Sequence, residues 1–216
     1  MASSTDTSAT DSARADIGVI GGSGFYEFLT GSERVTVSTP FGDPSDDVLI
    51  GDVEGRRVAF VARHGQGHTF PPHRVNYRAN LWALRSVGVR QVLAPCAVGS
   101  LRPEHGPGTI VVPDQVVDRT SGRDHTIFDG VGHVVHVGFA DPYCPGGRRA
   151  VLNAGRAARK NMVDAGTLVV INGPRFSSRA ESLWHQQAGW TVVGMTGMPE
   201  ASIARELAMC FTTIAL

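Results

Sequence analysis

Short apolar runs alternate with longer segments of helical periodicity along most of this chain. Apolar and β-branched runs predict strands at residues 16–20, 35–37, 47–53, 56–62, 91–94, 109–112, 166–172, 191–193 and 210–216. Apolar positions at helical spacing predict helices at 76–87, 147–165, 179–188 and 199–209. This alternation predicts an α/β fold, a single three-layer α/β/α domain around a mixed, mostly parallel central sheet.

Two regions depart from the alternation. Residues 1–15 are rich in Ser, Thr, Ala and Asp and lack the basic start and apolar middle of a signal peptide, so they are predicted to be a disordered tail before one domain at 16–216. Residues 118–138 are predicted to be a loop-rich insertion that carries several histidines. No apolar run approaches the ~20 residues needed to cross a bilayer.

The amino-acid composition and net charge indicate what kind of ligand this protein binds. The 216 residues are 42% hydrophobic, which suffices for a core without disulfides or metal. Twenty acidic and twenty basic residues leave no net charge, so the sequence favours a small-molecule ligand over nucleic acid or a membrane. The three cysteines, Cys96, Cys144 and Cys210, form neither a metal-binding pattern nor an evident disulfide framework, which predicts a reduced, cytoplasmic protein without a metal site.

Polar, glycine-bearing segments follow several of the predicted strands. In parallel α/β sheets, ligands bind at the carboxyl ends of the strands. Such segments occur at residues 21–24, 63–68, 97–100, 173–178 and 194–197. Because these five ends share one edge of the predicted sheet, their joint occurrence indicates a binding site there.

The segment after the strand at 56–62 indicates an anion. Arg63 offers a planar fork that matches two phosphate oxygens, and His64 adds a further donor. Taken alone, an Arg-His pair in a turn is equally compatible with solvated surface charges. The glycines at 21–24 do not form a dinucleotide fingerprint, because Glu27 stands where a small residue is required, and no Walker lysine follows. The hydroxyl and backbone N–H of Ser23 instead suit an anion cap.

With these residues the chain resembles the trimeric nucleoside phosphorylases, most closely the S-methyl-5'-thioadenosine phosphorylase branch. The resemblance runs from residue 17 to the end, and its sharpest match is Gly-Pro-Arg-Phe-Ser-Ser-Arg-Ala-Glu-Ser at 173–182. The other matching segments lie at 17–24, 39–46, 62–65 with His68, 75–80, 99–102, 114–115 with 118–120, and 195–196 with Pro199-Glu200.

The resemblance implies a phosphate site and a nucleoside site. It places phosphate on Ser23, Arg63, His64 and Thr196, with help from the backbone around Ala97. It places the ribose against Met195 and the purine near Phe176, whose aromatic face suits a flat base.

Two further residues bear on specificity. Ser177 favours an adenine-type base, because relatives that take 6-oxopurines carry glutamate there. His136 matches a residue that reaches the 5'-substituent pocket of a neighbouring subunit in a homotrimer.

The implied reaction is phosphorolysis, in which phosphate attacks the anomeric carbon while the purine leaves. It requires no cofactor, since inorganic phosphate is a co-substrate, and it requires a proton or hydrogen bond at N7 of the base. The family's general-acid aspartate is expected beyond Leu216, so the resemblance predicts a domain without its C-terminal segment and a chain with little activity. Cys96 replaces a threonine near the phosphate, and Gly194 replaces an asparagine of the methylthioadenosine branch.

Several alternatives stay open at this point. Gly194 also occurs in the 6-oxopurine branch, so inosine, guanosine or methylthioinosine are alternative substrates. A non-catalytic protein that binds nucleoside or phosphate would keep the pocket and lack the acid. A nucleosidase that uses water ranks lower because of Arg63 and His64, and a dinucleotide oxidoreductase ranks lowest because of Glu27.

Overall fold

The computed structural model describes residues 14–22, 24 and 30–216. Its strands are β1 (Ile17–Gly21), β2 (Thr30–Val35), β3 (Val48–Val53), β4 (Arg56–Ala62), β5 (Gln91–Cys96), β6 (Gly99–Ser100), β7 (Thr109–Val112), β8 (Gln115–Arg119), β9 (Asn161–Asp164), β10 (Thr167–Ile171), β11 (Val192–Gly194) and β12 (Cys210–Ala215). Its α-helices are α1 (Tyr77–Ser86), α2 (Pro145–Ala157), α3 (Arg179–Gln187) and α4 (Gly197–Glu206), and a short 3-10 turn, η3, covers Pro72–Arg74.

The main sheet has eight strands in the order β2-β3-β4-β1-β5-β12-β7-β9. Its centre is parallel, because β1 pairs with both β4 and β5, and β5 pairs with β12. Towards one edge β3 runs antiparallel to β4 and to β2, and β12 meets β7 antiparallel on the other side. The predicted mixed sheet is confirmed.

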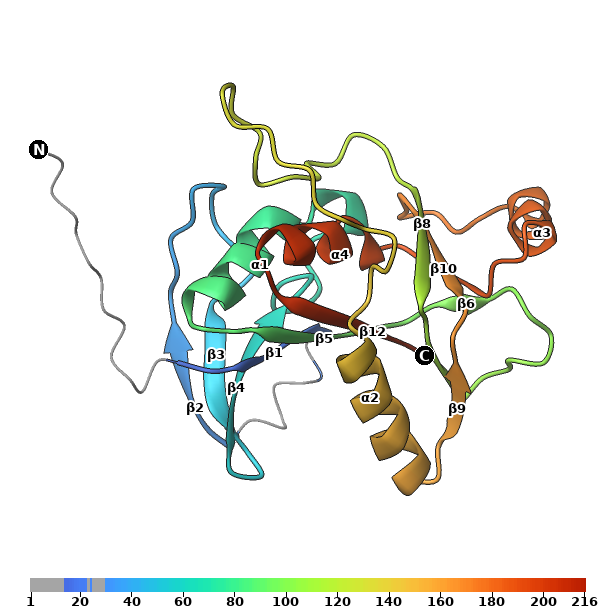
Figure 1. The fold of residues 1–216 in the computed structure, drawn as a ribbon, viewed down its shortest axis with the longest axis horizontal. Helices are drawn as coiled ribbons and strands as arrows, with labels where there is room; N and C mark the ends of the chain where they lie inside the picture. The colour runs from blue at the N-terminus through green and yellow to red at the C-terminus, as the bar shows by residue number, and fades with distance from the viewer. Residues whose placement is uncertain (1–13, 23, 25–29) are drawn as a thin grey trace, which may run out of the picture.

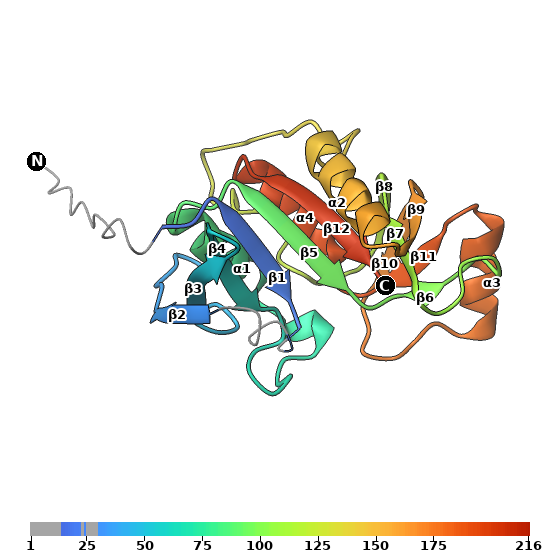
Figure 2. The ribbon, with the colours of Figure 1, turned by 90° about the horizontal axis from the view of Figure 1, so that it is seen from below.

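Helices cover both faces of this sheet. Figure 1 shows α1 and α4 on one face and α2 on the opposite face, and Figure 2 shows the same arrangement from below. Helix α1 packs on α4 and β4, whereas α2 packs on β7, β9 and β12. The three-layer α/β/α architecture is therefore confirmed.

The buried character of β4 follows from its place inside the sheet. Its last four residues, Ala59 to Ala62, are at most 1% exposed, as expected for a strand covered on both faces. Leu81 and Leu84 of α1 are fully buried against this layer. The helix begins at Asn76, whose side chain accepts a hydrogen bond from the backbone N–H of Ala79.

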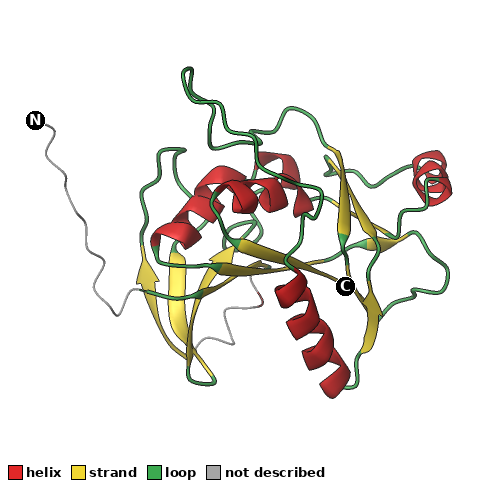
Figure 3. Ribbon diagram, viewed as in Figure 1, coloured by secondary structure: helices red, strands yellow, loops and turns green. Residues whose placement is uncertain are grey.

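A second, smaller sheet was not predicted. It has four strands in the order β6-β11-β10-β8, and β10 runs parallel to both β8 and β11. Figure 3 shows it beside the main sheet, with α3 at the outer side. Helix α4 contacts β5 and β12 of the large sheet and β8 and β10 of the small one, so it joins the two.

Other predictions need correction. The helix predicted at 147–165 ends at Ala157, and residues 161–164 form the strand β9, which pairs in parallel with β7. Arg159 between them adopts a positive φ of 55°, which ends the helix locally. The strand predicted at 35–37 lies at 30–35, and Gly99–Ser100, predicted as part of a turn, pairs with β11 as β6.

The predicted tail lies almost wholly outside the described residues. Its last residue, Ala15, is 4% exposed and donates its backbone N–H to the carbonyl oxygen of Val87. Among the helices described, none is both long and apolar enough to cross a membrane.

Candidate functional site

A cavity of about 780 Å³ opens at the carboxyl ends of β4, β5, β10 and β11. All five glycine-bearing segments predicted from the sequence contribute to its lining. The lining residues include Gly22, Arg63, His64, His68, Cys96, Ala97, Phe176, Ser177, Gly194, Met195 and Thr196. Strand ends from both sheets therefore meet around one space.

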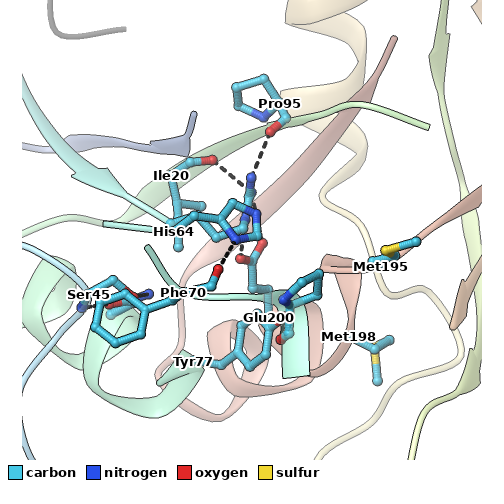
Figure 4. Close-up of polar contacts among 12 residues, drawn as sticks. Ile20, Ser45, His64, Phe70, Tyr77, Pro95, Met195, Met198 and Glu200 are labelled. Carbon is cyan, nitrogen blue, oxygen red and sulfur yellow. Dashed lines mark hydrogen bonds and ion pairs between the residues drawn. The ribbon is translucent and has the colours of Figure 1, made fainter. Parts of the chain in front are cut away.

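Arg63 directly follows β4 and is only 3% exposed. Its Nε lies 2.5 Å from Glu200 Oε1, and its Nη2 lies 3.1 Å from Glu200 Oε2. Nη2 also donates to the carbonyl oxygen of Ile20 at 2.8 Å, and Nη1 donates to that of Pro95 at 3.0 Å (Figure 4). Four of the five guanidinium N–H groups thus have acceptors, and one N–H of Nη1 has none among the described residues.

The ion pair keeps Arg63 charged although it is buried. Burial acts to lower the pKa of the guanidinium, but the charge and hydrogen bonds of Glu200 outweigh it and raise the pKa above its usual range. Burial raises the pKa of the Glu200 carboxyl, and the charges of Arg63 and Arg123 oppose that effect. The Arg63–Glu200 ion pair therefore places buried charges next to the cavity.

His64 has one ring nitrogen committed. Its Nδ1 lies 2.8 Å from the carbonyl oxygen of Phe70 (Figure 4). Its ring stacks on His68 with centroids 4.2 Å apart. Burial lowers its pKa, with the Phe70 carbonyl opposing and the charge of Arg63 adding to the decrease. The imidazole is therefore neutral at pH 7 and presents Nε2 for another partner.

The segment between β11 and α4 supplies Met195 and Thr196. Thr196 is 7% exposed and precedes α4, yet its hydroxyl makes no capping hydrogen bond, so it is available to a ligand. Arg123, itself buried, donates to the carbonyl oxygens of Met195, Met198 and Asn172 at 2.8, 2.5 and 3.0 Å. This arginine anchors the segment that carries Thr196.

Cys96 and Ala97 form the wall that follows β5. The Cys96 side chain is half-buried, and burial raises the pKa of its thiol to about 11, with the charge of Arg63 opposing. The group is thus a thiol and a weak donor at neutral pH. The adjoining backbone is held by the end of β12, because Leu216 donates its N–H to the carbonyl oxygen of Cys96 at 3.0 Å.

Phe176 and Ser177 form the rim that follows β10. The Phe176 ring is 85% exposed, which is unusual for an aromatic side chain and leaves its face open to a flat ligand. The Ser177 Oγ is buried without a hydrogen-bond partner among the residues described. Next to them, Ser178 and Glu181 form a capping box that begins α3.

The described lining of the cavity does not include two of the predicted site residues. Ser23 falls outside the described residues. His136 is exposed in the loop between β8 and α2 and does not line this cavity. No cluster of three or more potential metal ligands occurs in the described part of the chain.

Sequence reasoning missed the roles of two residues. Glu200 was part of a matched motif but was given no role, because its contact with Arg63 spans 137 residues. Arg123 lies in the segment predicted as a loop-rich insertion, where a single arginine carries no signal of its own.

A sequence model of the phosphorylase superfamily matches residues 16–216. The chain belongs to this superfamily. It is 64% identical to a purine nucleoside phosphorylase of Streptomyces coelicolor, over 94% of this chain and 75% of that protein. It is 60% identical to an S-methyl-5'-thioadenosine phosphorylase of Mycolicibacterium smegmatis, over 93% of this chain and 75% of that protein.

Solved structures agree with this membership. A methylthioadenosine phosphorylase from an antarctic soil metagenomic library superposes with a TM-score of 0.91 at 45% identity, covering 94% of this chain and 72% of that chain. A methylthioadenosine phosphorylase from Schistosoma mansoni in complex with tubercidin gives 0.88 at 38% identity, covering 94% and 79%. The family predicted from the sequence motifs is confirmed.

Proposed function

We propose that this protein is a nucleoside phosphorylase that transfers the pentosyl group of S-methyl-5'-thioadenosine, or of a related purine nucleoside, to inorganic phosphate. One observation carries the proposal: a single cavity contains a charged and polar group of residues beside an open aromatic ring. The first group comprises Arg63, His64 and Thr196, and the ring is that of Phe176. The reaction uses phosphate as co-substrate and no cofactor.

The cavity suits the charges of phosphorolysis. Phosphate held by Arg63, His64, Thr196 and the backbone at Ala97 stands in place to attack the anomeric carbon, an effect of orientation worth several kcal/mol. The same dianion stabilises the oxocarbenium character that develops on the ribose. Ser23 is proposed as a further phosphate contact.

We assign recognition of the nucleoside to residues at the rim of the cavity. Phe176 stacks on the purine, Met195 packs against the ribose, and the unpaired Ser177 Oγ supplies a small neutral partner that suits an adenine-type base. A 6-oxopurine nucleoside is the second candidate, because a relative at 64% identity is named a purine nucleoside phosphorylase and Gly194 fits that branch. Comparing turnover of methylthioadenosine with that of inosine separates the two.

Among the described residues that line the cavity, no side chain carries a carboxylate. We therefore propose that the proton for N7 comes from a group outside this lining. The general-acid aspartate that the resemblance implies stays a prediction.

Assembly and location complete the proposal. We propose a homotrimer in which His136 reaches a neighbouring subunit. The loop that carries His136 exposes Val131 and Val134, at 107% and 81%, which supports burial of this loop against another chain. The cysteines are free thiols, which supports a reducing, cytoplasmic location.

The experiment is a phosphate-dependence assay. The full-length protein is incubated with methylthioadenosine, with and without phosphate, and both adenine and the sugar product are quantified. We expect adenine release only with phosphate and a sugar 1-phosphate as product. Release that does not depend on phosphate would identify a nucleosidase instead, and phosphate binding without turnover would identify a binding protein.

A further inference from the structure

The guanidinium of Arg63 is fixed by its surroundings. Glu200 contacts both Nε and Nη2, and the side chains of the two residues are 3% and 1% exposed. The remaining partners are the backbone carbonyl oxygens of Ile20 and Pro95. An arginine held at four N–H groups has a single orientation, and one N–H of Nη1 is the donor it retains for a ligand.

Glu200 is also linked through α4 to Thr196, another proposed phosphate contact. It lies on α4 four residues after Thr196, whose hydroxyl makes no capping hydrogen bond and lines the same cavity. Helix α4 and the residue that precedes it therefore supply a ligand-facing hydroxyl and the carboxylate that orients the ligand-facing guanidinium. Arg123 holds the start of this helix through the Met198 carbonyl oxygen.

The charges around Glu200 leave the cluster positive. Arg63 and Arg123 both act on Glu200, so one carboxylate faces two guanidiniums. The partners that the described structure gives Arg123 are the Tyr77 hydroxyl and backbone carbonyl oxygens, all uncharged. Glu200 thus orients Arg63 without cancelling the positive charge beneath the cavity, which remains favourable for an anion.

We propose that Glu200 is a positioning residue for phosphate, acting through Arg63 and not by contact with the substrate. The inference rests on the proposed function, because it assumes that the anion in the cavity is phosphate. Glutamine at this position would replace one carboxylate oxygen by an NH₂ group that faces an Arg63 N–H. Two opposed donors cannot pair, so the guanidinium would turn away and lose its fixed Nη1 direction.

The test compares two variants with a matched control. Glu200→Gln removes the charge, whereas Glu200→Asp keeps the charge but is too short to span Nε and Nη2. Glu206→Gln is the control, since Glu206 lies on the same helix and binds Thr126 and Ile127, away from Arg63. Phosphate affinity is measured by isothermal titration, and KM is measured for phosphate and for methylthioadenosine on the full-length protein.

We expect both Glu200 variants to raise the Kd and KM for phosphate about tenfold or more, with the KM for nucleoside changed less than about threefold. Glu206→Gln should leave all three values unchanged. In an Arg63→Met background, Glu200→Gln should cause no further loss in kcat/KM for phosphate, because its effect passes through Arg63. If Glu200→Gln does not fold, Glu200→Asp carries the same comparison.

Three results would overturn the inference. They are wild-type phosphate affinity in the Glu200 variants, a parallel rise in both KM values, and an additive loss in the Arg63→Met background. A wild-type protein that does not bind inorganic phosphate at all would instead remove the proposed function, and the inference with it. Phosphate binding by the wild type therefore separates the two failures.

Discussion

The Nδ1 atom of His64 lies 2.8 Å from the carbonyl oxygen of Phe70. A carbonyl oxygen only accepts hydrogen bonds, so Nδ1 carries a proton, and the neutral ring presents the lone pair of Nε2 to its surroundings. When the ring is protonated, Nε2 becomes a donor instead. The same contact therefore orients the imidazole and makes its interaction with an anion dependent on pH.

Phosphate should raise the pKa of His64. Burial holds this pKa below its ordinary value of 6.5, and an anion in the cavity would favour the charged form. By linkage, phosphate binding should tighten as the pH falls towards the pKa of His64, because the protonated ring attracts the anion. An NMR titration of the His64 ring with and without phosphate measures the shift.

His185 provides an internal control for that titration. Burial also lowers its pKa, but it lies on α3 and does not line the cavity. Its midpoint should be the same with and without phosphate. Equal shifts at His64 and His185 would indicate a general salt effect and contradict the assignment.

Arg63→Met should destabilise the protein and strongly weaken phosphate binding. The change leaves Glu200 buried without its partner, which typically costs about 3–5 kcal/mol. Replacing both residues, as Arg63→Met with Glu200→Met, removes the unpaired charge and should restore most of the free energy of unfolding. Denaturant unfolding and phosphate titration of both variants test this prediction. Wild-type phosphate affinity in the double variant would show that Arg63 is not a ligand.

Cys96→Thr should tighten phosphate binding. The thiol, with a pKa of about 11, is a weak hydrogen-bond donor, and a hydroxyl at the same place donates more strongly. One improved hydrogen bond predicts a gain of about three- to tenfold in affinity. The same substitution at Cys210, which is exposed and does not line the cavity, should leave phosphate affinity unchanged. A weaker affinity in Cys96→Thr would place the anion elsewhere.

Ser178→Ala should weaken the start of α3. The Ser178 side chain accepts from the Glu181 backbone N–H and completes a capping box, whose loss typically costs about 1 kcal/mol. Thermal or urea unfolding monitors the change. Ser182→Ala, one turn later on the same helix, is the comparison and should cost less.

The same capping box predicts a pH response. The Arg175 side chain and the Ser178 backbone lower the pKa of Glu181 from 4.5 to about 2. Because this pKa is depressed in the folded state, its stabilising effect is present above pH 4.5 and is lost as the pH falls towards 2. Glu181→Gln should remove that part of the acid dependence.

The residues of the proposed phosphate site could be predicted from the sequence because their signals are local. Arg63 and His64 follow an apolar run directly, and the carboxyl ends of parallel strands meet at one edge whatever the order of the strands. Glu200 could be matched to a motif but not to a partner, because only the folded chain brings it to Arg63.

The errors in the predicted fold also arise from contacts between segments that lie far apart in the sequence. Strand β9 follows α2 closely, and its only strand partner in the described sheet is β7, some fifty residues earlier in the chain. Local periodicity carries no information about such a pairing, so the segment was assigned to the preceding helix. The division into two sheets likewise depends on contacts between distant segments, including those of α4.

The proposed site draws on both sheets. Arg63 and Ala97 follow strands of the eight-stranded sheet, whereas Phe176, Met195 and Thr196 follow strands of the four-stranded sheet. In this proposal, the segment after β10 contacts only the nucleoside, so substitutions at Phe176 can alter which base is accepted and leave Arg63 and Thr196 in place. A change of purine specificity then needs no rebuilding of the anion contacts.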